Sequence, residues 1–314
     1  MKRMLPINLN FELTTDCWYF SRLGIILSDE KSIPWFIERF ITLNMNDIFI
    51  TYYYDIDSPE FISLYDEFLY IEEIVDKQDI VQTAIKAVDN NGYVMLDCDR
   101  YYMESTTDYN KNHNTHEAMI IGYDDALKEF YYIDLATGRD IYTVSFSNLE
   151  SAFLSRVELI REKNDYNKWL LSLQYPAGIV YLREQYPNRQ PNLRKMYLAL
   201  DECLNGKKNF HKKDDKYPWR TGLSIYEGYY NDFYNSLKNS EKICIDFLND
   251  IVRGIKRLIE NKNGLLYRLN YLNDNQIVSI DESILEDIQR VYNEIKVAFS
   301  AVVKYNCTND ERSL

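Results

Sequence analysis

The sequence has few histidines, few cysteines and few chain-breaking residues. Among 314 residues there are three His, five Cys, ten Gly and seven Pro, whereas 46% are hydrophobic. This composition excludes a disordered or collagen-like protein and indicates a globular one, large enough for one big domain or two ordinary ones. No uncharged stretch reaches the roughly 18 residues that a membrane span requires, so we expect no membrane partner.

The cysteines are odd in number, widely spaced at positions 17, 98, 203, 244 and 307, and form no CxxC pair. This spacing argues against a disulfide framework and against a thiolate zinc site, and it predicts reduced thiols in a cytoplasmic protein. The polar residues Asn8, Asn10 and Glu12 interrupt any apolar signal segment at the start of the sequence.

The net charge of −13 is unevenly distributed. Residues 1–150 contain 11 Lys and Arg against 27 Asp and Glu, net −16, whereas residues 151–314 contain 25 against 22, net +3. The negative net charge argues against a protein that coats nucleic acid, because binding a polyanion requires a basic face on the protein. The asymmetry predicts two domains, which we place at 1–155 and 156–314.

The hydrophobic periodicity predicts an α+β fold. Helices are expected at 16–28, with Cys17 in the first turn, and at 78–91, ending at Asn91-Gly92. Helix or irregular cover is expected at 33–42 and 59–75, and a strand at 48–54. Four consecutive strands, 93–99, 118–123, 129–134 and 142–146, predict an antiparallel meander. The chain after residue 147 is helical in character, for example at 193–205, 222–261 and 283–304.

The meander brings a histidine beside a carboxylate. If His116 faces Asp134 in a hairpin, the turn is centred on residue 125, within the polar segment 124–128. A carboxylate there can accept the proton of one ring nitrogen and leave the other nitrogen as a base. Cys17, in the first turn of a helix, is placed where the macrodipole and a nearby His stabilise a thiolate nucleophile.

Several motifs around these residues resemble one family. They are D-R-Y-Y at 99–102, His116, I-I-G-Y-D at 120–124, Y-Y-I-D at 131–134 and T-G-L-S-I at 221–225. The chain resembles the family of butirosin biosynthesis protein H and its relatives near the C39-like papain-fold peptidases, most strongly over 93–140. The resemblance implies a papain-like domain followed by a helical domain.

The resemblance also implies an activity. It makes Cys17 the nucleophile, His116 the general base and Asp134 the orienting acid of a cysteine acyltransferase in secondary-metabolite biosynthesis, as in antibiotic and nonribosomal-peptide pathways. Such an enzyme moves an acyl or peptidyl group from the phosphopantetheine thioester of a carrier protein to a small-molecule acceptor, and needs no cofactor of its own. One departure is Phe11, which stands where papain-like enzymes often have a Gln for the oxyanion; the flanking Asn10 is the candidate substitute.

Other residues have two interpretations each. Asp99, Tyr101 and Tyr102 either line the acyl pocket or only close a strand, and Cys98 is expected in the core. His113, with Asp97 and Asp99, suggests a metal site, but we favour a solvated loop histidine and expect no metal.

The segment 207–220 is the only dense basic loop, with six basic residues against two acidic ones. Acyl carrier proteins are acidic, so Lys207, Lys208, Lys212 and Lys213 are candidate docking residues. The alternative is an ordinary solvated loop.

Two other functions remain open on the sequence. The first is hydrolysis by the same three residues, as a C39-like peptidase or a thioesterase. The second is a catalytically silent binding protein of a biosynthetic complex.

Overall fold

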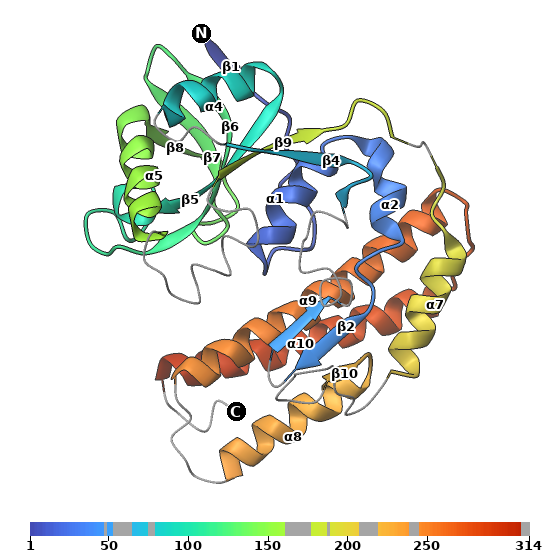
Figure 1. Ribbon diagram of the computed structural model, residues 1–314. Helices are drawn as coiled ribbons and strands as arrows, with labels where there is room; N and C mark the ends of the chain where they lie inside the picture. The colour runs from blue at the N-terminus through green and yellow to red at the C-terminus, as the bar shows by residue number, and fades with distance from the viewer. Residues whose placement is uncertain are drawn as a thin grey trace. The chain divides into compact units, whose positions relative to one another are not determined.

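The four consecutive strands form one antiparallel sheet. In the computed structural model, the strands β5 (Gly92–Asp99), β6 (Thr115–Asp124), β7 (Glu129–Ile133) and β8 (Tyr142–Ser145) are neighbours in that order (Figure 1). The predicted meander is confirmed. The structure describes residues 1–46, 49–52, 65–74, 79–160, 177–186, 189–206, 219–238 and 245–308.

Distant segments complete this sheet. Strand β9 (Ala177–Leu182) pairs with β5, β4 (Leu69–Glu73) pairs with β9, and β1 (Lys2–Met4) pairs with the end of β6. The prediction of helix or irregular cover was wrong for β4, and the prediction of a helical chain after residue 147 was wrong for β9. Both strands pair only with residues remote in sequence, so a local pattern carries little information on them.

Three helices belong to the same part of the chain. They are α1 (Cys17–Ile26), α4 (Ile80–Asp89) and α5 (Phe146–Ile160), and Figure 1 shows α4 and α5 against the sheet. The predicted helices at 16–28 and 78–91 are confirmed. Asp79 caps α4 by accepting a hydrogen bond from the main-chain N–H of Gln82.

The rest of the chain is mainly helical. A short 3-10 helix η1 (Glu30–Ser32) leads into α2 (Ile33–Ile37), and β2 (Leu43–Asn46) lies between β3 (Phe49–Tyr52) and β10 (Trp219–Thr221) in a second sheet. The helices that follow are α7 (Leu193–Leu204), α8 (Ser224–Lys238), α9 (Ile245–Asp274) and α10 (Glu282–Thr308). The helices expected at 193–205 and 283–304 are confirmed, whereas 222–261 contains two helices, with residues 239–244 outside the described part.

Helix α9 contacts β3 and the chain segment that precedes β2. Its side chains Arg257, Asn261 and Arg268 donate hydrogen bonds to main-chain carbonyls within 39–50. Because these side chains recur at spacings of four and seven, they follow one side of the helix. Helix α10 packs along α9.

Contacts divide the chain into two compact units. The first comprises Met1–Glu30 and Ser58–Asn188, and the second comprises Lys31–Asp57 and Arg189–Leu314. The boundary predicted between residues 155 and 156 lies inside α5, and the assignment of domains to 1–155 and 156–314 stays a prediction. The α+β class with a helical C-terminal region is confirmed. Among the described helices, none has the length and apolarity needed to cross a membrane.

Gly122 allows β1 to approach β6, and this gives a first prediction. A Cβ at Gly122 would lie 2.5 Å from the carbonyl oxygen of Arg3 and 2.8 Å from the Cα of Met4, both main-chain atoms. We expect Gly122→Ala to lower the free energy of unfolding by about 1–3 kcal/mol, as other overpacked substitutions do. Urea denaturation measures this change.

The matched control is Gly178→Ala in β9 of the same sheet. Its Cβ would lie 3.1 Å from the side-chain Cγ2 of Ile71, which can move by a few tenths of an ångström, and at an ordinary contact distance of 3.7 Å from the carbonyl oxygen of Glu72. We expect a clearly smaller loss of stability. Equal losses for the two variants would contradict the role of Gly122.

Candidate active site

His116 and Asp134 are in direct contact. His116 is the second residue of β6 and Asp134 follows the last residue of β7. The distance from His116 Nδ1 to Asp134 Oδ1 is 2.8 Å, and the carboxylate is buried while 26% of the histidine side chain is exposed. The expected contact is therefore confirmed, with the acid inside and the ring at the boundary with solvent.

The hairpin reaches this contact in a different register from the one predicted. Met119 pairs with Ile133, so the same register places Asp134 opposite Ala118 rather than opposite His116. The difference is two residues, which keeps both side chains on one face, and diagonal neighbours on adjacent strands lie within reach of each other. The register then shifts by one more residue at a bulge before Gly122, so the turn is not centred on residue 125 as expected.

Asp134 is held as a charged carboxylate. Its Oδ1 accepts a hydrogen bond from the main-chain N–H of Ala136 at 2.9 Å, and its Oδ2 accepts one from Thr137 Oγ1 at 2.9 Å. The guanidinium of Arg100 lies 3.6 Å from Oδ2. Burial raises the pKa of Asp134, but His116, Thr137 and Arg100 together outweigh burial and hold it below its ordinary value.

The contacts of His116 define one tautomer. Its Nδ1 lies 3.1 Å from the carbonyl oxygen of Glu117 as well as 2.8 Å from Asp134, so Nδ1 carries the proton. Nε2 has no hydrogen bond to any residue that the structure describes. Burial lowers the pKa of His116, whereas the hydrogen bond and the charge of Asp134 raise it. Together with the other contacts they outweigh burial, so the pKa lies above its ordinary value.

Cys17 is the first residue of α1, as expected, and is half-buried. The shift in the pKa of Cys17 is opposite to the one predicted. Burial raises the pKa of the Cys17 thiol, the negative charges of Glu117 and Asp16 raise it further, and Arg22 offsets only part of this effect. The macrodipole of a helix terminus is equivalent to about half a charge, and here burial and full negative charges outweigh it. Cys17 is therefore a neutral thiol at rest.

Glu117, which the sequence analysis did not single out, connects α1 to β6. Ser21 Oγ donates a hydrogen bond of 2.7 Å to Glu117 Oε1, and Arg22 Nη1 lies 3.8 Å from Oε2. Ser21, Arg22 and Glu117 are all buried. The available signal was a carboxylate directly after His116, within an otherwise apolar strand.

Asn10 is exposed and lies in a shallow groove of about 570 Å³ that is lined by Ile7, Leu9, Arg139 and Ile141. Arg139 donates hydrogen bonds to main-chain carbonyls of the segment that precedes α1. This groove therefore joins the chain before Cys17 to the loop after Asp134. The role of Asn10 in an oxyanion hole stays a prediction.

Asp99 closes strand β5. It is fully buried, accepts a hydrogen bond from the main-chain N–H of Tyr101 at 3.0 Å, and accepts another from Ser155 Oγ of α5 at 2.8 Å. The 3-10 helix η3 (Arg100–Tyr102) begins at this point. The rings of Tyr101 and Tyr102 are 5.1 Å apart. Whether these residues also line an acyl pocket stays a prediction.

His113 lies on the loop before β6 and its side chain is exposed, as expected, but it also contacts Asp99 and Tyr101. Its Nδ1 lies 2.7 Å from Asp99 Oδ2, and its ring stacks on Tyr101 with centroids 4.4 Å apart. Asp97 turns to Arg156 instead. Among the residues that the structure describes, no group of three potential metal ligands occurs. Cys98 is buried in the core, as predicted.

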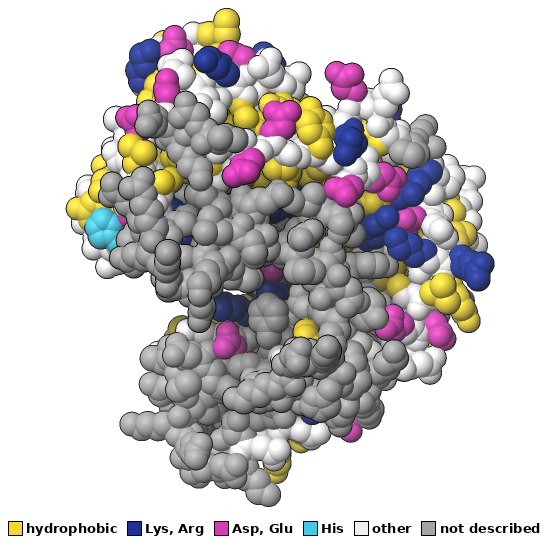
Figure 2. Space-filling model, in the orientation of Figure 1, with side chains coloured by type: hydrophobic (Ala, Val, Ile, Leu, Met, Phe, Trp, Pro, Cys, Tyr) yellow, Lys and Arg dark blue, Asp and Glu magenta, His cyan; other side chains and the backbone are white. Residues whose placement is uncertain are grey.

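Basic residues of the second unit gather around one buried carboxylate. Glu38 Oε1 lies 3.2 Å from Arg189 Nη2 and 3.5 Å from Lys195 Nζ, and it also pairs with Arg39. Figure 2 shows Lys and Arg side chains over the region where α2 and α7 lie in Figure 1. We call Arg39, Arg189 and Lys195 the basic cluster, and all three lie near the Glu38 carboxylate. Lys207, Lys208, Lys212 and Lys213 lie outside the described residues.

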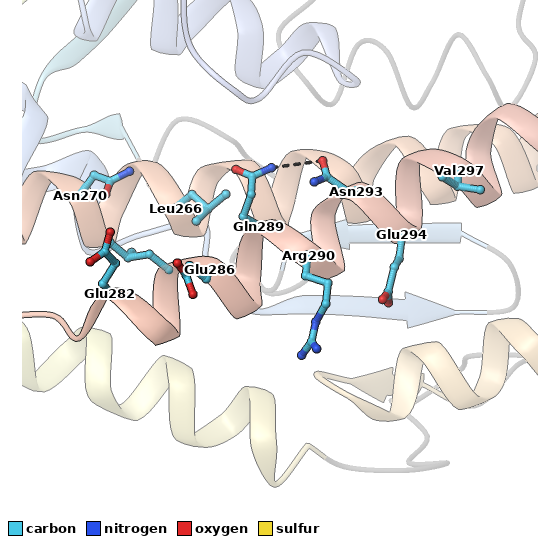
Figure 3. Close-up of a pocket in the computed structure, with 10 residues that line it drawn as sticks. Leu266, Asn270, Glu282, Glu286, Gln289, Arg290, Asn293, Glu294 and Val297 are labelled. Atoms are coloured by element: carbon cyan, nitrogen blue, oxygen red, sulfur yellow. Dashed lines mark hydrogen bonds between the residues drawn. The ribbon is translucent and has the colours of Figure 1, made fainter.

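A groove of about 650 Å³ between α9 and α10 has the opposite character (Figure 3). Its apolar and acidic lining includes Leu266, Leu285, Val297, Glu282, Glu286 and Glu294. Arg290 is the only basic residue among the described residues that line it, and it pairs with Asp287 at 2.8 Å. An acidic partner would be repelled there.

The pairing of His116 with Asp134 gives a second prediction. We expect Asp134→Asn to lower the pKa of His116, because the charge that raises it is removed, and NMR titration of the ring measures this. The raised pKa of His116 contributes stability below pH ~6.5, and the lowered pKa of Asp134 contributes it above pH ~3.9. The substitution should therefore destabilise the protein most between these values and less above the His116 pKa.

The control for this experiment is Asp140→Asn, which removes an exposed charge from the following loop. It should leave the His116 titration in place. An unchanged His116 titration in Asp134→Asn would show that the 2.8 Å contact is absent in solution.

No protein-family model matches this sequence, and no curated protein sequence matches it significantly.

Proposed function

We propose that the chain is a cysteine-dependent acyltransferase with a papain-like first unit. Cys17 takes an acyl or peptidyl group from a carrier-protein thioester and passes it to a small-molecule acceptor in secondary-metabolite biosynthesis. The observation that carries the proposal is the contact between His116 and the buried Asp134, which is the arrangement that makes an imidazole a general base. The position of Cys17 at the start of a helix linked to β6 supports its role as the nucleophile.

The chemistry proceeds in two balanced steps. His116 Nε2 accepts the thiol proton as the sulfur of Cys17 attacks the thioester carbonyl, and the bond from that carbonyl to the phosphopantetheine sulfur breaks. The leaving sulfur takes the proton from His116, and the acyl group remains on Cys17. An acceptor amine then attacks the acyl-enzyme, gives its proton to His116, and Cys17 leaves and is reprotonated.

A neutral resting thiol is compatible with this substrate class. Because burial and Glu117 raise the pKa of Cys17, deprotonation accompanies the attack instead of preceding it. Main-chain N–H groups at the start of α1, with that of Cys17 among them, are the proposed donors to the oxyanion. Asn10 is the proposed additional donor.

One observation favours a second candidate function, a catalytically silent binding protein. The raised pKa of Cys17 is the opposite of what activated cysteines usually show. A thiol that never leaves the protonated form would fit a protein that binds its partner and performs no chemistry.

The deciding experiment uses a small thioester, hexanoyl-N-acetylcysteamine, and intact-protein and peptide mass spectrometry. We expect a hexanoyl adduct on Cys17, absent in Cys17→Ala and formed about 10²–10⁴-fold more slowly in His116→Ala, because the general base is lost. The matched control is Cys203→Ala, which removes another half-buried thiol with a raised pKa. An amine added afterwards should remove the adduct by transfer, whereas loss to water alone would indicate a hydrolase. No adduct on Cys17 in the wild type or in His116→Ala would favour the silent binding protein.

The proposed partner, an acidic carrier protein, gives a further prediction. We expect charge reversal of Lys207, Lys208, Lys212 and Lys213 to Glu to slow acylation from a hexanoyl-loaded acyl carrier protein at least tenfold and to spare hexanoyl-N-acetylcysteamine. The physical reason is the loss of electrostatic attraction, which should also weaken with added salt.

The matched control is charge removal in the acidic groove, Glu282→Gln with Glu286→Gln, which should not slow the carrier-bound donor. Equal effects of the lysine reversal on both donors would contradict the docking proposal.

A further inference from the structure

The link between α1 and β6 has a specific geometry. Cys17 and Ser21 are four residues apart on α1 and therefore share one face of the helix. Ser21 Oγ donates a 2.7 Å hydrogen bond to Glu117 Oε1, and Glu117 directly follows His116 in β6. The helical face that carries Cys17 is thus joined to the strand that carries His116, across 96 residues of sequence.

A second contact restrains the rotation of the helix. Arg22, the next residue of α1, places its Nη1 3.8 Å from Glu117 Oε2. Two consecutive residues of α1 therefore hold the two oxygens of one carboxylate. Rotating or sliding the helix would break at least one of these contacts.

We propose that Glu117 is a positioning residue of the candidate site: through Ser21 and Arg22 it sets Cys17 against the strand that carries His116. The inference rests on the proposed function only in taking Cys17 as the reacting group.

Burying Glu117 costs free energy, which argues against a purely structural role for this side chain. Its side chain is only 4% exposed, and its Oε2 has the ion pair but no hydrogen bond. A buried carboxylate with incomplete hydrogen bonding costs free energy that a hydrophobic side chain of similar volume would avoid. The same charge also raises the pKa of both Cys17 and His116.

Other charged groups face this region from every element packed around it. They are Asp16 just before α1, Arg22 on α1, Asp97 on β5 with its partner Arg156 on α5, Arg100 on η3, and Asp134 after β7. Among the charges that raise the pKa of Cys17, Glu117 has the largest effect. Removing it should therefore have a larger effect on Cys17 than removing any other carboxylate.

Two substitutions separate the charge of Glu117 from its hold on α1. Glu117→Gln keeps an oxygen that Ser21 can donate to but removes the charge. Ser21→Ala keeps the charge but removes the hydrogen bond. The readout is the pH dependence of iodoacetamide alkylation of Cys17, followed by peptide mass spectrometry, which needs no acyl donor. Thermal melts establish that each variant is folded.

We expect the alkylation profile of Glu117→Gln to move to lower pH, with a rate at pH 7 at least three times that of the wild type. We expect Ser21→Ala to keep the wild-type alkylation profile but to form the Cys17 hexanoyl adduct at least tenfold more slowly, with Ser21→Thr restoring much of the rate. Glu129→Gln, which removes a charge from β7, is the matched control and should alter neither readout.

The outcomes separate this inference from the proposed function. A shifted alkylation profile in Glu117→Gln shows that the Glu117 charge lies beside Cys17, as the inference requires, even if no thioester acylates Cys17, in which case only the acyltransferase proposal fails. A profile identical to that of the wild type in folded Glu117→Gln overturns the inference, even if wild-type Cys17 is acylated. If Glu117→Gln does not fold, wild-type acylation by folded Ser21→Ala overturns it, and slowed acylation rescued by Ser21→Thr supports it.

Discussion

The first unit depends on how it neutralises carboxylates that it buries at one end of its sheet. A charge removed from water costs several kcal/mol unless hydrogen bonds or an opposite charge replace the solvent. Four carboxylates from β5, β6 and the end of β7 are buried and carry this cost: Asp97, Asp99, Glu117 and Asp134. Asp97 pairs with Arg156, and Asp99 contacts Ser155 and His113. Glu117 contacts Ser21 and Arg22, and Asp134 contacts His116, Thr137 and Arg100. Because most of these partners come from α1, α5 and the loops next to the strands, satisfying the carboxylates also fixes α1, α5 and the polar loops relative to the sheet.

Local pattern was sufficient for the elements whose partners are close in sequence. The meander, the contact of His116 with Asp134, and the position of Cys17 at a helix start all follow from residues within a hairpin or a single helical turn. The register of the hairpin did not follow, because the polar segment 124–128 fits more than one turn centre, and a bulge near Gly122 shifts the register by one more residue without leaving a clear signal in the sequence. A two-residue error preserves the face of each side chain, so the contact was predicted correctly from an incorrect register.

Elements that depend on distant partners could not be predicted in this way. Strands β4 and β9 acquire their identity by pairing with each other and with β5, and the bond from Ser21 to Glu117 spans 96 residues. The prediction of a lowered pKa for Cys17 was wrong for the same reason. The helix start is visible in the sequence, whereas burial and the neighbouring Glu117 exist only in the folded chain. The macrodipole is a weak local effect, and full charges brought together by the fold exceed it.

The same negative charges raise the pKa of Cys17 and of His116, and this has a chemical consequence. Moving a proton from the thiol to the imidazole depends on the difference between the two pKa values, and a charge that raises both leaves much of that difference intact. Glu117 acts in the same direction on the pKa of Cys17 and on the pKa of His116. Asp134 acts less evenly, because it is hydrogen-bonded to His116 and not to Cys17, and it favours the imidazolium. Under the proposed function, such a site would keep its thiol protonated in water and would deprotonate it only as a thioester carbonyl is attacked, which would suit an activated acyl group rather than general thiol reactivity.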